Sequence, residues 1–251
     1  MSAPKTTVIT VTQDRPEYLA EAIASIEAQT DSDWEHLVYD QGSRDPRNVE
    51  VLKAAKLRNP DKFFYAAPGG RGPDVVGFYW NMLLGMARGR YITILDDDNR
   101  KHPEFLQVMT RMMDLDPSLE ATTCGWSPID EKGQPSGEER HWNTLTSMAK
   151  LWQSNTIDSN AIVFRRSVID KIGQFDGSLT TNEDWHFMIR LARSCCVLHR
   201  NESLLEYREH AKARSRRAVQ LGAYGNWDRI RKELFTAEER KQALTPQNGV
   251  K

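Results

Sequence analysis

Three consecutive aspartates, Asp96, Asp97 and Asp98, directly follow an apolar segment of the chain. Mg²⁺ and Mn²⁺ prefer carboxylate and phosphate oxygens, so such a cluster can hold a divalent cation together with the phosphates that the cation carries. Residues two apart on a strand face the same way, so Asp96 and Asp98 could share one task. The alternative is a solvated acidic turn before the next helix, and the triplet alone leaves both interpretations open.

A second acidic pair, Glu183 and Asp184, lies near the start of a predicted amphipathic helix over residues 182–194. The helix dipole stabilises acidic side chains at this position, which accounts for the pair without any chemistry. Alternatively, one of the two carboxylates stays ionised and serves as a general base.

Basic residues cluster at 207–217, where His210 could bind a metal ion or a phosphate and Arg208 could neutralise phosphates. A solvated basic surface explains the same residues. Arg71 lies in a glycine-rich segment, 68–73, whose backbone could approach a phosphate closely.

Strands and helices are expected to alternate through the first hundred residues. The β-branched segment 6–12 and the segments 34–40, 62–67 and 90–95 are typical of strands, and helical spacing of apolar residues lies between them. This alternation predicts βαβ units and a mostly parallel sheet. Ligands bind beyond the carboxyl ends of such strands, so we expect residues 13–14, 41–42 and 96–98 to converge on one crevice.

The second half predicts a different pattern. We expect helices over 103–116 and 145–154, a strand over 120–130, a strand and short helix over 159–173, and two short strands over 195–210. A helix over 224–235 places Trp227, Ile230 and Leu234 on one face. That face is expected to pack on the domain, with a dimer or membrane-surface contact as the alternative.

Composition limits the classes of partner and compartment. The chain has 251 residues, a net charge of −1 and three cysteines without metal-site spacing. The net charge gives no global attraction to nucleic acid or membranes. The absence of a signal-like leader, of an apolar run of roughly 20 residues and of a disulfide framework predicts a soluble, cytoplasmic protein.

Four segments, in order, resemble family-2 inverting glycosyltransferases with the GT-A fold: "TVITVTQDRPEYL", "NMLLGMARGRYITILDDDN", "IVFRRSVIDKIGQFDGSLTTNEDWHFMIRLA" and "LLEYREH". The resemblance implies an α/β, Rossmann-like central sheet, mostly parallel and flanked by helices, with a smaller antiparallel acceptor-side portion. It implies one GT-A domain over 1–220, with a nucleotide-sugar half (1–100) and an acceptor half (101–220). Residues 221–251 would form a C-terminal helix and polar tail.

The family transfers a sugar from a nucleotide-sugar to an acceptor hydroxyl with inversion. By resemblance, Asp184 is the catalytic base and Glu183 its neighbour on the acceptor side. The resemblance implies Mn²⁺ or Mg²⁺ as cofactor, bound by Asp98, Asp96 and His210, with Arg208 and His210 at the diphosphate. The implied donor-nucleotide residues are Val11, Gln13, Arg15, Asp40, Gln41, Arg71, Asp96 and Asp97, and those for acceptor and sugar are Trp152, Asn155, Asp158 and Asn160.

Gln41 departs from the family pattern, because an aspartate usually accepts the uracil N3–H at this position. A glutamine amide both donates and accepts, so a UDP-sugar stays the favoured donor while another base is possible. The acceptor would be a glycan or another hydroxyl-bearing molecule. The basic stretch after residue 207 leaves DNA open as an acceptor.

Two other classes remain as alternatives. A sugar-phosphate nucleotidylyltransferase shares the strand order, but it usually carries a "GxGTR" loop where this chain has "VTQDRPEY". A catalytically silent module that binds carbohydrate or nucleic acid is less compatible with intact acidic residues at both 96–98 and 183–184.

Overall fold

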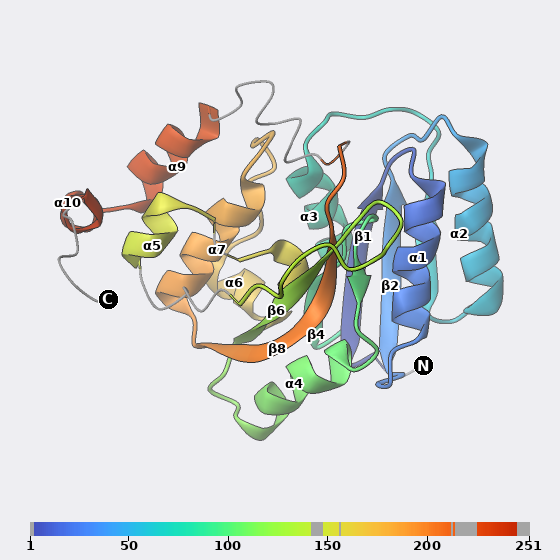
Figure 1. The fold of residues 1–251 in the computed structure, drawn as a ribbon, viewed down its shortest axis with the longest axis horizontal. Helices are drawn as coiled ribbons and strands as arrows, with labels where there is room; N and C mark the ends of the chain where they lie inside the picture. Colours follow the sequence, from blue (N-terminus) through green and yellow to red (C-terminus); the bar gives the residue numbers. More distant parts are fainter. Residues whose placement is uncertain (1–2, 142–147, 156, 212, 214–224, 245–251) are drawn as a thin grey trace.

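A single eight-stranded, curved sheet forms the centre of the molecule, and helices cover it (Figure 1). The computed structural model describes residues 3–141, 148–155, 157–211, 213 and 225–244. The strands are β1 (Thr6–Thr12), β2 (Trp34–Asp40), β3 (Phe63–Ala66), β4 (Tyr91–Ile94), β5 (Arg100–Lys101), β6 (Ala121–Ile129), β7 (Ile162–Arg165) and β8 (Val197–Arg208). The helices are α1 (Pro16–Glu27), α2 (Pro46–Arg58), α3 (Val76–Met86), α4 (Phe105–Leu115), α5 (Met148–Gln153), α6 (Val168–Ile172), α7 (Glu183–Ser194), α9 (Gly225–Leu234) and α10 (Ala237–Leu244), with a 3₁₀ turn η1 (Ser159–Ala161).

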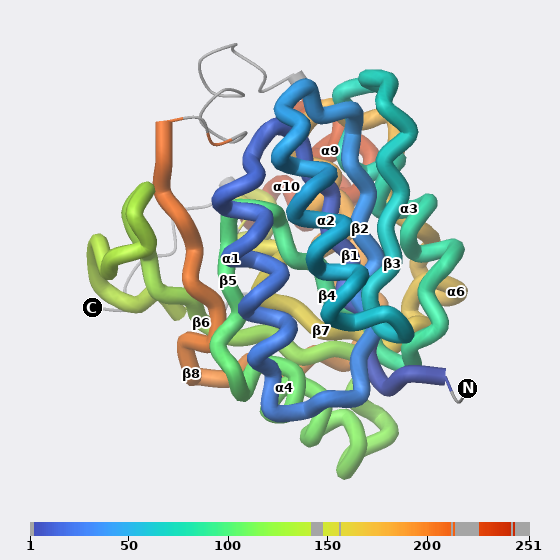
Figure 2. The backbone as a smooth tube through the Cα atoms, turned by 90° about the vertical axis from the view of Figure 1, so that its right-hand side faces the viewer, coloured from blue at the N-terminus to red at the C-terminus, as the bar shows by residue number. Residues whose placement is uncertain are grey.

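The N-terminal half forms the predicted parallel sheet, in the order β3-β2-β1-β4. Neighbouring residues of β1 enter different cores, because side chains alternate across a strand. Val8 packs in a cluster with α1 and α4, whereas Ile9 packs in a cluster with α3 and α7. Helices α1 and α2 therefore cover one face of this half and α3 the other, as Figure 2 also shows.

The other half of the sheet is mixed, with β7 antiparallel to both β4 and β6 and β8 parallel to β6. The expectation of two short strands over 195–210 is wrong, because β8 runs unbroken from Val197 to Arg208. Both parts of β8 pair with β6, and the pairing register shifts around Gly125. The exposed residues Asn201 and Glu202 at its middle resemble a turn in sequence, yet they lie within the strand.

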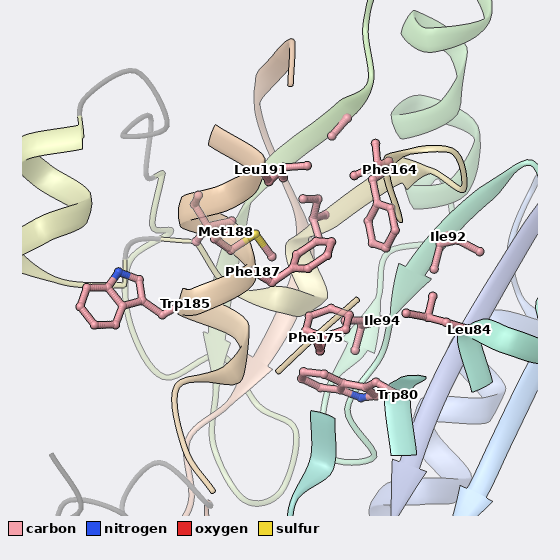
Figure 3. Close-up of a cluster of buried hydrophobic side chains, with 14 of the residues drawn as sticks. Trp80, Leu84, Ile92, Ile94, Phe164, Phe175, Trp185, Phe187, Met188 and Leu191 are labelled. Carbon is pink, nitrogen blue, oxygen red and sulfur yellow. The ribbon is translucent and has the colours of Figure 1, made fainter. Parts of the chain in front are cut away.

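Helix α7 is anchored in the apolar core on the α3 side of the sheet (Figure 3). The Phe187 ring stacks on Phe175 with a centroid distance of 4.2 Å, and its other neighbour is Phe164 at 5.4 Å. Trp185 leaves the helix on a different side and donates its indole N–H to the Leu151 carbonyl at 2.9 Å. Contacts on both sides fix the helix, and therefore the carboxylates in its first turn.

The C-terminal region packs on this core through α9, whose Ile230 is fully buried and whose Trp227 contacts the Trp185 ring. Residues 237–244 form a further helix, α10, beyond the single C-terminal helix expected from the sequence. The local reason is a capping box: the Glu239 N–H donates to the Thr236 hydroxyl, and the Thr236 N–H donates to the Glu239 carboxylate.

No helix in the described ranges is long and apolar enough to span a bilayer.

Candidate active site

The acidic triplet forms a turn beyond the carboxyl end of β4, since the strand ends at Ile94. The carboxylate of Asp97 turns toward the end of β1. Its Oδ2 accepts from the Thr12 hydroxyl at 2.8 Å and from the Gln13 N–H at 3.3 Å, and its Oδ1 accepts from Arg15 at 2.8 Å. The structure thus brings residues 12–15 and 97 together, as the parallel sheet predicts.

The carboxylate of Asp98 contacts both Arg15 and His210. Its Oδ2 lies 3.0 Å from Nε2 of His210, which follows β8, and 2.6 Å from Nη1 of Arg15. A carboxylate and an imidazole on adjoining segments are donors that suit a divalent cation such as Mn²⁺. Across the described part of the chain, however, no group of three or more His, Cys, Asp or Glu side chains could hold a metal ion. The protein therefore brings together two of the donors that a cation would need.

Asp96 takes different partners from Asp98. Its backbone N–H donates to Oδ1 of Asn160 at 2.5 Å, and its carboxylate accepts from Nδ2 of Asn160 at 2.9 Å. The same Nδ2 donates to Asp158 at 2.7 Å. Two half-buried carboxylates thus share one amide donor, and their desolvation raises the pKa of both. Asp158 and Asn160, predicted for the acceptor, therefore support the acidic turn.

Lys101 is a buried residue of this network that sequence reasoning missed. Its ammonium donates to the Asn160 carbonyl at 2.6 Å and lies 3.7 Å from the Phe105 ring centroid. Burial lowers the pKa of Lys101 to about 7. The sequence holds no local signal for this burial, because Asn160 is distant along the chain.

The residues predicted for the nucleotide converge at the ends of β1 and β2. The Gln13 amide donates to the Gln41 carbonyl at 3.0 Å, and Gln41 Nε2 donates to the Pro73 carbonyl at 2.7 Å. Arg71 reaches the Gln13 side-chain oxygen at 3.2 Å. The glycine-rich loop therefore contacts both glutamines at the ends of β1 and β2.

Asp40 and Val11 are internal to this region. Asp40 is buried and accepts from the Ser43 N–H at 2.7 Å, and Val11 packs at the edge of the core. Gly42 has φ 80°, and a Cβ there would lie 2.5 Å from the Gly70 carbonyl oxygen. A glycine at this position lets the two loops approach each other.

The predicted catalytic pair begins helix α7, after Asn182 in the left-handed conformation with φ 66°. Nδ2 of Asn155 donates to Oδ2 of Asp184 at 2.6 Å. Glu183 is buried, and a Cβ on Gly77 would lie 3.4 Å from the Glu183 Cβ. The first turn of α7 is thus held by α3 on one side and by the segment after α5 on another.

Two residues predicted to contact ligands, Trp152 and Arg208, have protein partners in the structure. The Arg231 guanidinium carbon lies 5.0 Å from the centroid of the Trp152 ring. The Phe235 ring packs against the same tryptophan, with a centroid distance of 5.1 Å. The fully buried Arg208 side chain donates to the Asp98 carbonyl at 2.9 Å and to Glu21 at 2.5 Å. Their contacts with sugar and diphosphate stay predictions. The remaining basic residues of 212–217 lie outside the described residues.

The acidic turn makes stability depend on pH in an unusual direction. Burial, opposed by Arg15 and reinforced by Asp98, raises the pKa of Asp97 from 3.8 to about 6. The folded state then binds this proton more tightly than the unfolded state, so the resulting stability is full below pH 4 and is lost as pH rises through 6. Two pKa units correspond to about 3 kcal/mol at most.

Urea unfolding without divalent cations, from pH 4 to pH 7, checks this expectation. The free energy of unfolding of the wild type, relative to Asp97→Asn, should fall by up to about 3 kcal/mol over this range. A difference between the two proteins that is constant with pH would contradict it.

Solved structures of two glycosyltransferases are similar to this protein in fold. The mannosyltransferase PcManGT of Pyrobaculum calidifontis, solved with GDP-Man and Mn²⁺, has a TM-score of 0.68 and 17% identity, over 97% of this chain and 68% of that chain. S. aureus TarS 1–349, solved with UDP-GlcNAc, has a TM-score of 0.66 and 18% identity, over 83% of this chain and 60% of that chain. The fold is therefore GT-A, as expected.

The family model "Glycosyl transferase family 2" matches residues 7–173. The chain belongs to glycosyl transferase family 2, which favours sugar transfer over nucleotidylyl transfer. An uncharacterized glycosyltransferase of Rickettsia typhi is 26% identical over 94% of this chain and 74% of its own length. An uncharacterized protein of Sinorhizobium fredii is 25% identical, but this chain spans only 20% of it. Asp184 and His210 lie beyond the matched residues 7–173.

Proposed function

We propose that this protein is a metal-dependent inverting glycosyltransferase that moves a sugar from a nucleoside-diphosphate sugar to an acceptor hydroxyl. One observation carries the proposal: the segment from Asn155 to Asn160 links the two acidic centres. Asn155 holds Asp184 at 2.6 Å, and Asn160 holds Asp96 at 2.9 Å. Six residues span at most about 20 Å, which supports placing the predicted base and the predicted donor-binding turn in one site.

Asp184 is the proposed base of this reaction. It takes the proton of the acceptor hydroxyl while that oxygen attacks the anomeric carbon from the face opposite the leaving diphosphate, which inverts the configuration. The N-terminus of α7 favours the ionised carboxylate. Asn155 fixes the orientation of one carboxylate oxygen by its hydrogen bond to Oδ2.

Asp98 and His210 would hold the cation, and the oxygens of the diphosphate would complete its coordination. A bound Mn²⁺ or Mg²⁺ supplies positive charge that neutralises the leaving diphosphate. The Mn²⁺ in the PcManGT complex supports this part of the proposal.

The proposed donor is a UDP-sugar, with another base as the alternative, since the two similar structures hold UDP-GlcNAc and GDP-Man. Nε2 of Gln41 faces the Pro73 carbonyl, so the amide oxygen is the atom that would accept an N–H from a base. The proposed acceptor is a glycan or another molecule with a hydroxyl group.

A thermal-shift panel of nucleoside diphosphates, with and without Mn²⁺, tests this function. At least one diphosphate at 100 times its Kd should stabilise the protein by about 2.7 kcal/mol, because it binds only the folded state. Asp98→Asn should lose the Mn²⁺-dependent part of that shift. If no diphosphate stabilises the wild type under either condition, the proposed function is wrong.

A further inference from the structure

The guanidinium of Arg15 forms ion pairs with two carboxylates of the proposed cation and donor site. Its Nη1 is 2.8 Å from Oδ1 of Asp97 and 2.6 Å from Oδ2 of Asp98. These two charges raise the pKa of Arg15 although burial alone would lower it, so the side chain stays charged. Arg15 thus neutralises the acidic turn from within the protein.

The backbone at Arg15 is fixed independently of its side chain. Arg15 directly precedes α1, and its N–H donates to Oδ1 of Asn48 at 3.0 Å, while Asn48 in turn donates to the Thr12 hydroxyl at 3.2 Å. Any change of partner by the guanidinium must therefore come from rotation of the side chain, whose atoms are 24% exposed.

Binding of a cation to Oδ2 of Asp98 while Arg15 contacts the same oxygen is electrostatically unfavourable. That single oxygen already contacts both Arg15 and His210, at 2.6 and 3.0 Å. A metal ion coordinated there would stand a few Å from a guanidinium, and two positive charges at such a distance repel strongly at a partly buried site. The cation and the guanidinium therefore compete for the same oxygen.

We propose that Arg15 is an internal latch on the cation site: it must leave Asp98 before a divalent cation binds, and the nucleotide's diphosphate releases it by offering another anion. The inference rests on the proposed function, which supplies the cation and the diphosphate. Guanidinium groups bind phosphate oxygens in a planar, two-point geometry, so the diphosphate is a suitable alternative partner. Nucleotide binding then strengthens cation binding, and by linkage the cation strengthens nucleotide binding by the same factor.

Variants that remove the charge of Arg15 test the latch. Their Mn²⁺ affinity is determined by titration, with free Mn²⁺ measured by electron paramagnetic resonance. The wild type, Arg15→Gln and Arg15→Lys are compared with and without UDP, GDP and dTDP. Arg15→Gln should bind Mn²⁺ at least tenfold more tightly than the wild type without nucleotide. In Arg15→Gln, the factor by which nucleotide strengthens Mn²⁺ binding should be at least tenfold smaller than in the wild type. Arg15→Lys should retain most of this factor.

The matched control is Arg47→Gln, which removes an exposed arginine that pairs with Asp45 and Glu17 outside the acidic turn. Its Mn²⁺ affinity should equal that of the wild type. Circular dichroism melting shows whether each variant is folded, and Arg15→Met, which keeps the aliphatic stem, replaces Arg15→Gln if the latter unfolds.

The outcomes separate the latch from the function. One outcome is that the wild type binds Mn²⁺ in the presence of a diphosphate, but Arg15→Gln and the wild type bind Mn²⁺ equally tightly when no nucleotide is present. In that case the latch is wrong and the function stands. If the wild type binds no Mn²⁺ with any diphosphate, the metal-dependent function fails and the latch fails with it.

Discussion

Asp184→Asn should lower the rate of sugar transfer by about 10²- to 10⁴-fold, the range expected for loss of a general base. An amide at neutral pH cannot take the proton of the acceptor hydroxyl. The fold should be preserved, because the new side chain has the same shape. Its carbonyl oxygen can also accept the hydrogen bond that Asn155 now donates to Oδ2 at 2.6 Å. The proposed role of Asp184 is toward the acceptor hydroxyl and not toward the nucleotide, so binding of the nucleotide should persist.

The rate is measured as acceptor-dependent release of nucleoside diphosphate, using a sugar donor whose diphosphate stabilises the wild type. Asp228→Asn is the matched control, since Asp228 is an exposed acidic residue in the first turn of α9. It should leave the rate unchanged. A fully active Asp184→Asn protein would remove the base assignment, and loss of nucleotide binding in that variant would indicate a structural defect instead.

The sequence predicted the parts of the molecule that depend on local patterns. The β-branched residues of β1, and the alternation of strands with helices such as α1 and α2, identified the parallel half of the sheet. Residues that are distant in the chain could be predicted to share one crevice, because parallel strands bring their carboxyl ends to one edge of the sheet. This is why Gln13, Gln41 and the acidic triplet could be placed together before the structure was known.

The roles that the sequence left open depend on long-range contacts. Arg208 lies in a basic stretch, yet its side chain is fully buried because Glu21, on α1, and the Asp98 carbonyl both accept from it. The i, i+2 argument for Asp96 and Asp98 assumed a strand, whereas β4 ends at Ile94 and the triplet turns. Such outcomes depend on which residues the fold brings opposite each other, and local periodicity carries no information about that.

Asn160→Asp should destabilise the protein by about 3 to 5 kcal/mol at neutral pH, as loss of a buried charge partner does. Asn160 is fully buried, and its Nδ2 is the donor that the carboxylates of Asp96 and Asp158 share at 2.9 and 2.7 Å. The substitution preserves shape, so packing does not explain a loss. It removes both N–H donors and adds a third, fully buried carboxylate between two half-buried ones.

The loss should shrink as pH falls, because a protonated Asp at position 160 regains one O–H donor. Burial already raises the pKa of Asp96 and Asp158, so protons bind this cluster more tightly in the folded state, and the variant should gain stability toward low pH. Urea unfolding followed by far-UV circular dichroism at pH 5 and pH 7 measures the effect. Asn201→Asp, an exposed position in β8, is the matched control and should change stability by no more than about 0.5 kcal/mol. Equal effects of the two substitutions at pH 7 would show that the shared amide does not hold the acidic turn. A loss confined to Asn160→Asp would show that the acidic turn depends on the segment that also holds the proposed base.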